Sequence, residues 1–167
     1  MLKIYLVNLG KYNAGIDTGK WIEFPVVDIE ETLESVGVGY NDEYLIVDYE
    51  SDIEGLDINQ YESLEELNEF AKKLENLSEY DKELFTAILD YESNRDYLEL
   101  IDKLEDYNLY TDINNDEDLG AYWLEETAYI KPDNPLYNYI DTEKYGQDIR
   151  LESQGCFTQY GWIEYVG

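Results

Sequence analysis

The most unusual feature of this chain is a long stretch of uncompensated negative charge. Residues 21–71 contain sixteen Asp and Glu but neither Lys nor Arg. Over the whole chain, 40 acidic residues against 11 basic ones give a formal net charge of −29. A charge of this size says more about the partners of a protein than about its fold. The first question is therefore whether the charge belongs to a folded protein at all.

The apolar content indicates that it does. Hydrophobic residues make up 44% of the chain and aromatic residues 15%, which is too much apolar surface for a disordered acidic tail. A chain of 167 residues is long enough for one ordinary domain or for two or three very small ones. We therefore expect a globular or modular protein, and composition alone does not choose between the two.

The net charge restricts the partners. A free nucleic acid or an anionic membrane surface would repel this chain, which leaves a basic protein, bound cations, or a salty environment in which acidity serves only solubility. No segment approaches the roughly 18–20 apolar residues of a membrane span, and the start "MLKIYLVNLGKYN" lacks the apolar region and cleavage site of a signal peptide. We therefore expect a cytoplasmic protein with no nucleic-acid or membrane partner.

The N-terminal part alternates strand and helix signals. β-branched and aromatic residues predict strands over 3–9 and 20–26, separated by a loop rich in Gly and Asn over 10–19. Asp28, followed three residues later by Glu, is a predicted N-cap and begins a short helix. A third strand is predicted over 43–50.

The middle of the chain has helical periodicity. Ser63 is a predicted N-cap for a helix whose apolar face includes Leu67 and Phe70. Two more helical segments are predicted over 78–93 and 94–107, each with apolar residues at helical spacing.

The C-terminal part again mixes the two kinds of element. A short strand is predicted over 107–113 and a helix beginning near Asn115, and the last residues contain two β-like runs around a Gln-Tyr-Gly turn. The sequence therefore predicts an α+β protein built as an elongated chain of three small domains. The predicted domains are residues 1–61 (α/β), 62–103 (helical) and 104–167 (α/β).

Several kinds of chemistry lack the residues they need. The chain has no His and one Cys, Cys156, which removes His-dependent nucleophile arrangements and the common zinc sites. No Gly-rich phosphate-binding loop is present. A calcium loop beginning at Asn114 would use Asp116, Asp118 and Glu125, but Leu119 stands where the sharp turn requires Gly. We therefore expect no enzyme activity, no cofactor and no metal site, and we interpret the three Trp as core residues.

The charge itself suggests mimicry of DNA. Duplex DNA carries about one negative charge per 1.7 Å of its axis, so the net charge of −29 matches roughly 15 base pairs, a length of about 50 Å. A compact globule of this chain length has a radius of gyration of only about 15 Å. A row of small domains would supply the missing length, and its carboxylates would bind Lys and Arg as phosphates do.

Two blocks of the sequence resemble the ArdA antirestriction proteins carried by conjugative plasmids and transposons. The blocks are "IYLVNLGKYNAGIDTGKWIEFP" and "YIDTEKYGQDIRLESQGCFTQYGWIEYV". In the first block the matching positions are Asn8, Leu9, Gly10, Lys11, Tyr12, Asn13, Gly15, Gly19, Trp21, Phe24 and Pro25. In the second block they are Tyr139, Ile140, Asp141, Tyr145, Gly146, Asp148, Gly155, Phe157, Gly161 and Glu164. Thr142 and Gln147 depart from the family pattern, which often has an aromatic residue and Arg there.

The resemblance implies a function and an assembly. It implies a bacterial cytoplasmic protein, encoded on a mobile genetic element such as a conjugative transposon, that mimics bent B-form DNA. Such a protein occupies the DNA-binding channel of type I restriction–modification enzymes and blocks restriction, often modification as well. The resemblance also implies an elongated, curved homodimer whose subunits have three small domains each and join through their C-terminal regions.

Our hypothesis is a non-enzymatic competitive inhibitor in which many carboxylates, each contributing little, stand in for phosphates. The candidate partner-binding residues are Asp28, Glu30, Glu31, Glu34, Asp42, Glu43, Asp48, Glu50, Asp52, Glu54, Glu62, Glu65, Glu66, Glu69, Asp112, Asp116, Glu117, Asp118, Glu125 and Glu126.

Three alternatives stay open at this point. An acidic module could neutralise another basic DNA-binding protein, such as a histone-like protein or a toxin. A glycosidase could use two of the many carboxylates. Halophilic adaptation would explain the acidity without any partner, and it predicts unfolding at low salt rather than loss of binding at high salt.

Overall fold

The chain folds into two compact units. The structure, a computed structural model, describes residues 1–167. The first unit comprises Met1–Lys82 with Asp96–Ile101, and the second comprises Glu83–Arg95 with Asp102–Gly167. The predicted mixture of helices and antiparallel strands is confirmed, while the division into three domains at 61/62 and 103/104 stays a prediction. No helix combines the length and the apolar composition that crossing a membrane requires.

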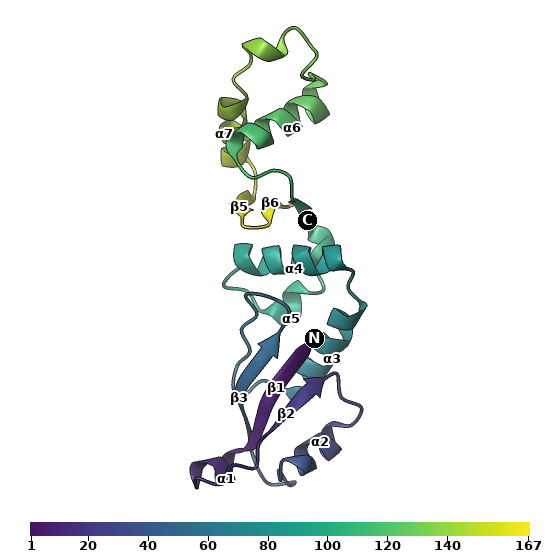
Figure 1. The fold of residues 1–167 in the computed structure, drawn as a ribbon, viewed down its shortest axis with the longest axis vertical. Helices are drawn as coiled ribbons and strands as arrows, with labels where there is room; N and C mark the ends of the chain where they lie inside the picture. The colour runs from purple at the N-terminus through teal and green to yellow at the C-terminus, as the bar shows by residue number, and fades with distance from the viewer. The chain divides into compact units, whose positions relative to one another are not determined.

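A three-stranded antiparallel sheet forms the centre of the first unit (Figure 1). Its strands are β1 (Leu2–Asn8), β2 (Lys20–Phe24) and β3 (Tyr44–Ser51), in the order β2-β1-β3. The predicted strands over 3–9, 20–26 and 43–50 are confirmed. The side chains of Leu2, Ile4 and Leu6 in β1 are at most 1% exposed, because the central strand places alternate residues in the core.

The first unit has four helices: α1 (Leu9–Asn13), α2 (Ile29–Ser35), α3 (Leu64–Asn76) and α5 (Tyr97–Leu100). Of these, α3 and α5 contribute buried residues to the core. The predicted caps are confirmed at Asp28, which accepts from the Glu31 N–H at 3.0 Å, and at Ser63, which accepts from the Glu66 N–H. The buried Asn68 ties α3 to Val26, because its side chain accepts from the Val26 N–H at 2.7 Å and donates to the Val26 carbonyl at 3.1 Å.

Two helical predictions were wrong in extent. The loop predicted over 10–19 contains α1, because the Asn8 side chain caps it by accepting from the Lys11 N–H at 2.9 Å. The helix predicted over 94–107 shrinks to the single turn α5 and the 3-10 turn η1 (Leu104–Asp106). The chain leaves the helical conformation there because it continues directly into a strand.

The second unit holds a smaller antiparallel sheet in the order β4-β6-β5. Its strands are β4 (Tyr107–Tyr110), β5 (Gly155–Thr158) and β6 (Gly161–Tyr165), which confirms the predicted strands at these places. Between β4 and β5 lie α6 (Asp116–Ala128), the 3-10 turn η2 (Tyr137–Tyr139) and α7 (Thr142–Glu152). Helix α4 (Glu79–Tyr91) lies within the helical segment predicted over 78–93, and the hydroxyl of Ser78 before it accepts from the Asp81 N–H at 3.1 Å.

Helices α6 and α7 cross with their backbones nearly in contact. A Cβ at Gly120 would overlap the carbonyl oxygen of Thr142, and a Cβ at Gly146 would overlap that of Asp116. Beside the crossing, Arg150 holds Asp116 in a two-pronged ion pair, with Nε donating to Oδ1 at 2.7 Å and Nη2 to Oδ2 at 3.1 Å. Glycine is required at both crossing positions because any larger side chain would meet backbone.

The prediction that all three Trp belong to the core was wrong for one of them. Trp162 is fully buried, but Trp21 is 45% exposed. Trp21 lies in β2, and its ring packs edge-to-face on the ring of Tyr5, with the centroids 5.5 Å apart. An apolar neighbourhood in the sequence does not fix which face of an edge strand a side chain occupies.

Asn8 is a buried hydrogen-bonding hub at the end of β1. Besides capping α1, its amide nitrogen donates to the Gly37 carbonyl at 2.8 Å and to Asp42 Oδ2 at 3.1 Å. Lys11 Nζ also donates to the Gly37 carbonyl, at 3.1 Å. Asp42 in turn accepts from the Gly39 N–H at 3.0 Å. The hub therefore fixes the loop between α2 and β3.

We expect Asn8→Ala to destabilise the first unit by about 2–3 kcal/mol, because it leaves the partners of a buried amide unsatisfied. Urea unfolding followed by circular dichroism measures this loss. The matched control is Asn41→Ala, in the same loop but exposed, for which we expect a change within about 0.5 kcal/mol. Equal stability of the two variants would show that the hub contributes nothing.

Candidate functional site

The candidate carboxylates lie mostly at the surface. Of the predicted partner-binding residues, only four are half-buried and the others are exposed. The half-buried residues are Glu62, Asp116, Asp118 and Glu125. A carboxylate must be accessible to replace a phosphate, so exposure is the first requirement that the predicted set meets.

Several of the candidates also have structural partners. Asp28 caps α2, Asp42 belongs to the Asn8 hub, and Asp52 Oδ1 pairs with the N-terminal ammonium at 2.6 Å. Asp116 is held by Arg150, and Asp118 accepts from Asn115 Nδ2 at 2.8 Å. The two aspartates of the rejected calcium-loop pattern thus hold the start of α6. These five carboxylates therefore support the fold.

Two helices of the first unit carry carboxylates with no cation beside them. No Lys or Arg lies within 4 Å of Glu30, Glu31 or Glu34 in α2, or of Glu65 or Glu66 in α3. Neighbours at i, i+3 and i, i+4 on one helix stand about 5–6 Å apart, so these like charges repel. The arrangement lowers the stability of each helix and raises its attraction for a basic partner.

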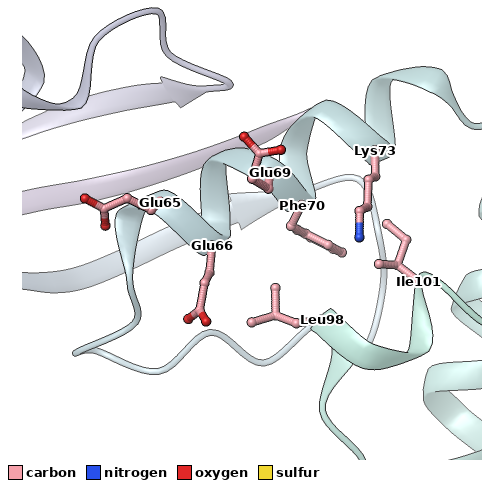
Figure 2. A pocket seen from close by; sticks show the side chains of 7 residues that line it. All are labelled: Glu65, Glu66, Glu69, Phe70, Lys73, Leu98 and Ile101. Carbon is pink, nitrogen blue, oxygen red and sulfur yellow. The ribbon is translucent and has the colours of Figure 1, made fainter.

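A hollow lies between α3 and α5 in the first unit (Figure 2). Its volume is about 270 Å³, and it is lined by Glu65, Glu66, Glu69, Phe70, Lys73, Leu98 and Ile101. Figure 2 shows Phe70, Leu98 and Ile101 facing a common space, with Glu66 at one end and the Lys73 ammonium at the other. Glu65 and Glu69 point outward from α3. The floor is apolar and one end of the rim is acidic.

Several carboxylates make the electrostatic potential around the start of α3 negative. Burial raises the pKa of Glu62, and the nearby charges of Asp96, Glu66 and Asp57 raise it further. Burial also raises the pKa of Tyr97, and the same carboxylates together with Glu62 add to the effect. The Tyr97 hydroxyl is buried without a hydrogen-bond partner. Burial is the first cause of both shifts, and the neighbouring carboxylates add to it.

The raised pKa of Glu62 predicts a pH effect on stability. A carboxyl whose pKa is higher in the folded protein takes up its proton more readily there than in the unfolded chain, so stability rises as pH falls toward that pKa. We expect the first unit to gain stability between pH 7 and pH 5, and to gain less in Glu62→Gln. Thermal melting at both pH values, with Glu34→Gln as an exposed control, measures the difference. An identical gain in Glu62→Gln and wild type would contradict this prediction.

Sequence reasoning missed part of this site. Asp57 and Asp96 both contribute to the field around Glu62 and Tyr97, yet neither was a candidate. They come from separate loops with no shared periodicity, so the sequence carried no signal that would bring them beside α3. The apolar floor was missed for the same reason, because Phe70 and Leu98 belong to different helices.

The two motif blocks lie mainly where the fold is held together. Asn8 and Lys11 form the hub of the first unit, and Gly146 lies at the crossing of α6 and α7. Asp141 caps α7 by accepting from the Lys144 N–H at 3.0 Å. The buried Glu164 accepts from the Tyr110 hydroxyl at 3.1 Å. The motifs therefore secure the scaffold that carries the acidic surface.

A family model matches nearly the whole chain. The family model described as antirestriction protein (ArdA) matches residues 4–164. No curated protein matches this chain.

Proposed function

This chain belongs to the ArdA family of antirestriction proteins, and we propose that it acts as a mimic of DNA. In this proposal it occupies the DNA-binding channel of a type I restriction–modification enzyme and inhibits restriction, and often modification. It acts without catalysis, by excluding DNA. Inhibition would come from carboxylates that bind the Lys and Arg side chains of the enzyme, which otherwise bind DNA phosphates.

One observation carries the proposal. Exposed carboxylates cover α2, the loops beside β3 and the first half of α3, and residues 21–71 supply no cation to neutralise them. The like-charge neighbours in α2 and α3 lower stability, so a solvated surface alone does not account for them. Carboxylates that enter a basic protein channel would displace the anions bound there into the solvent, as phosphates do. Complementary charge would also speed the encounter.

The remaining parts of the proposal come from the resemblance. We propose that the protein works in the bacterial cytoplasm as the product of a mobile genetic element, and that it forms an elongated homodimer through its C-terminal region. We also propose three small domains per chain. Phosphate-mimicking carboxylates are proposed throughout the candidate set, with Asp28, Asp42 and Asp116 serving the fold as well.

A competition titration tests the function. The protein is added to a type I methyltransferase bound to a fluorescent target duplex, and fluorescence anisotropy reports the bound fraction of DNA. We expect displacement at near-stoichiometric amounts of protein. No displacement by protein that circular dichroism shows to be folded would rule out inhibition of that enzyme.

A set of several type I enzymes decides between the proposal and its nearest alternative. Failure against all of them would favour an acidic module that neutralises another basic DNA-binding protein. In that case a pull-down would retain such a protein and no restriction enzyme.

A further inference from the structure

We propose that the hollow between α3 and α5 is an anchor site that takes one arginine side chain of the partner protein. The aliphatic stem would lie over Phe70 and Leu98, and the guanidinium would pair with Glu66 at the acidic end. The inference rests on the proposed function in one respect, the identity of the partner that carries this arginine. In phosphate mimicry, many carboxylates each contribute a little to the affinity. The anchor site instead assigns a large share of the affinity to the hollow.

The shape of the hollow supports a single long side chain. Its volume of about 270 Å³ corresponds to roughly nine waters at their liquid volume of about 30 Å³ each. The floor consists of the buried Phe70 and Ile101 and the half-buried Leu98. Phe70 is held in place by Tyr97, whose ring packs edge-to-face on it at 4.8 Å between centroids. Of these three residues Leu98 is the most exposed, so a side chain that covers the floor removes mainly the apolar surface of Leu98 from water.

The charges around the hollow favour a cation at one end only. Glu66 lies beside Leu98 and has no Lys or Arg within 4 Å, whereas the Lys73 ammonium lies at the Ile101 end (Figure 2). An incoming cation is therefore drawn toward Glu66. Asp57 and Asp96, like Glu66, act on Glu62 and Tyr97, so further negative charge lies around the start of α3.

Arginine fits this combination better than lysine. Its guanidinium is planar, binds a carboxylate with two parallel hydrogen bonds and is less strongly hydrated than an ammonium, so it loses less when it leaves water. The guanidinium also stacks on aromatic rings. A DNA-binding channel is rich in arginine because the same two-pronged geometry recognises phosphate. Buried arginine is among the side chains that most often dominate an interface.

Filling the hollow without changing any charge tests the inference. We expect Leu98→Trp to weaken displacement of DNA from the methyltransferase by at least tenfold. The matched control is Leu136→Trp, an exposed leucine of the second unit, for which we expect a change of less than twofold. Equal inhibition by both variants would overturn the anchor site and leave DNA mimicry standing. Thermal melting establishes that Leu98→Trp is folded.

A small probe tests the hollow without any enzyme, so that its failure is distinct from failure of the proposed function. In an NMR titration we expect butylguanidinium to shift the methyl resonances of Leu98 and Ile101 until the shifts saturate. In Glu66→Gln we expect these shifts to disappear. Guanidinium and 1-butanol, each lacking half of the probe, should give weaker shifts. Shifts that follow ionic strength alone, equal for guanidinium and butylguanidinium, would overturn the inference even if the protein displaces DNA.

Discussion

Replacing Gly146 by alanine is expected to destabilise the second unit by at least about 3 kcal/mol. The added Cβ would overlap the carbonyl oxygen of Asp116 and stand 2.7 Å from the backbone nitrogen of Gly120. Overpacking in a core typically costs about 1–3 kcal/mol where side chains can adjust. Here the obstacles are backbone atoms of α6, so the two helices must separate, and the ion pair between Arg150 and Asp116 is strained with them.

Gly10 provides the matched control for this prediction. It is also a glycine in a helix and in a motif block, but a Cβ there would meet only Asn8 Oδ1 at 3.5 Å, an ordinary contact. Alanine has the higher helix propensity, so Gly10→Ala should leave stability unchanged or raise it by up to about 1 kcal/mol. Hydrogen exchange resolves the two units separately. If the backbone amides of α6 and α7 in Gly146→Ala exchanged as slowly as in the wild type, the prediction would be contradicted.

Raising the salt concentration from about 50 to 200 mM is expected to weaken binding to the DNA-free methyltransferase on the order of a thousandfold. Proteins that make six to ten phosphate contacts lose about 10³–10⁵ in affinity over this range. A mimic that binds the same Lys and Arg side chains through exposed carboxylates should approach this dependence. Isothermal titration calorimetry or anisotropy with labelled protein, at several salt concentrations, gives the slope.

The same series separates mimicry from adaptation to a salty environment. Circular dichroism at each salt concentration reports the fold independently of binding. We expect a folded protein at 50 mM salt, because the apolar core needs no added salt and ion pairs are screened least at low salt. Unfolding at low salt, with binding that strengthens as salt is added, would favour the halophilic explanation.

Local signals in the sequence predicted local structure well. The caps at Asp28 and Ser63 are confirmed, because a cap depends on residues three positions apart. The helix predicted to begin near Asn115 is confirmed too. The strands of both sheets are confirmed as well, since alternation of residue types is visible along the chain. The limits of the helical segment after Tyr97 were wrong, because the chain beyond it is drawn into β4.

Contacts between distant segments were beyond the sequence. Nothing in the spacing indicated that Gly120 and Gly146 meet, or that Leu98 faces Phe70. The exposed position of Trp21 depends on which face of β2 turns toward the core, and composition does not determine it. The candidate carboxylates were predicted from charge alone, and their ranking as free or structurally engaged required the hydrogen bonds.

The backbone contact between α6 and α7 has an evolutionary consequence. A helix pair joined through two glycines places its strictest steric requirement on two positions, and it leaves the outward faces of both helices comparatively free to vary. A lineage that meets new host enzymes could then relocate surface carboxylates without rebuilding this unit. Among diverging descendants of this chain we expect acidic positions to drift while Gly120 and Gly146 persist.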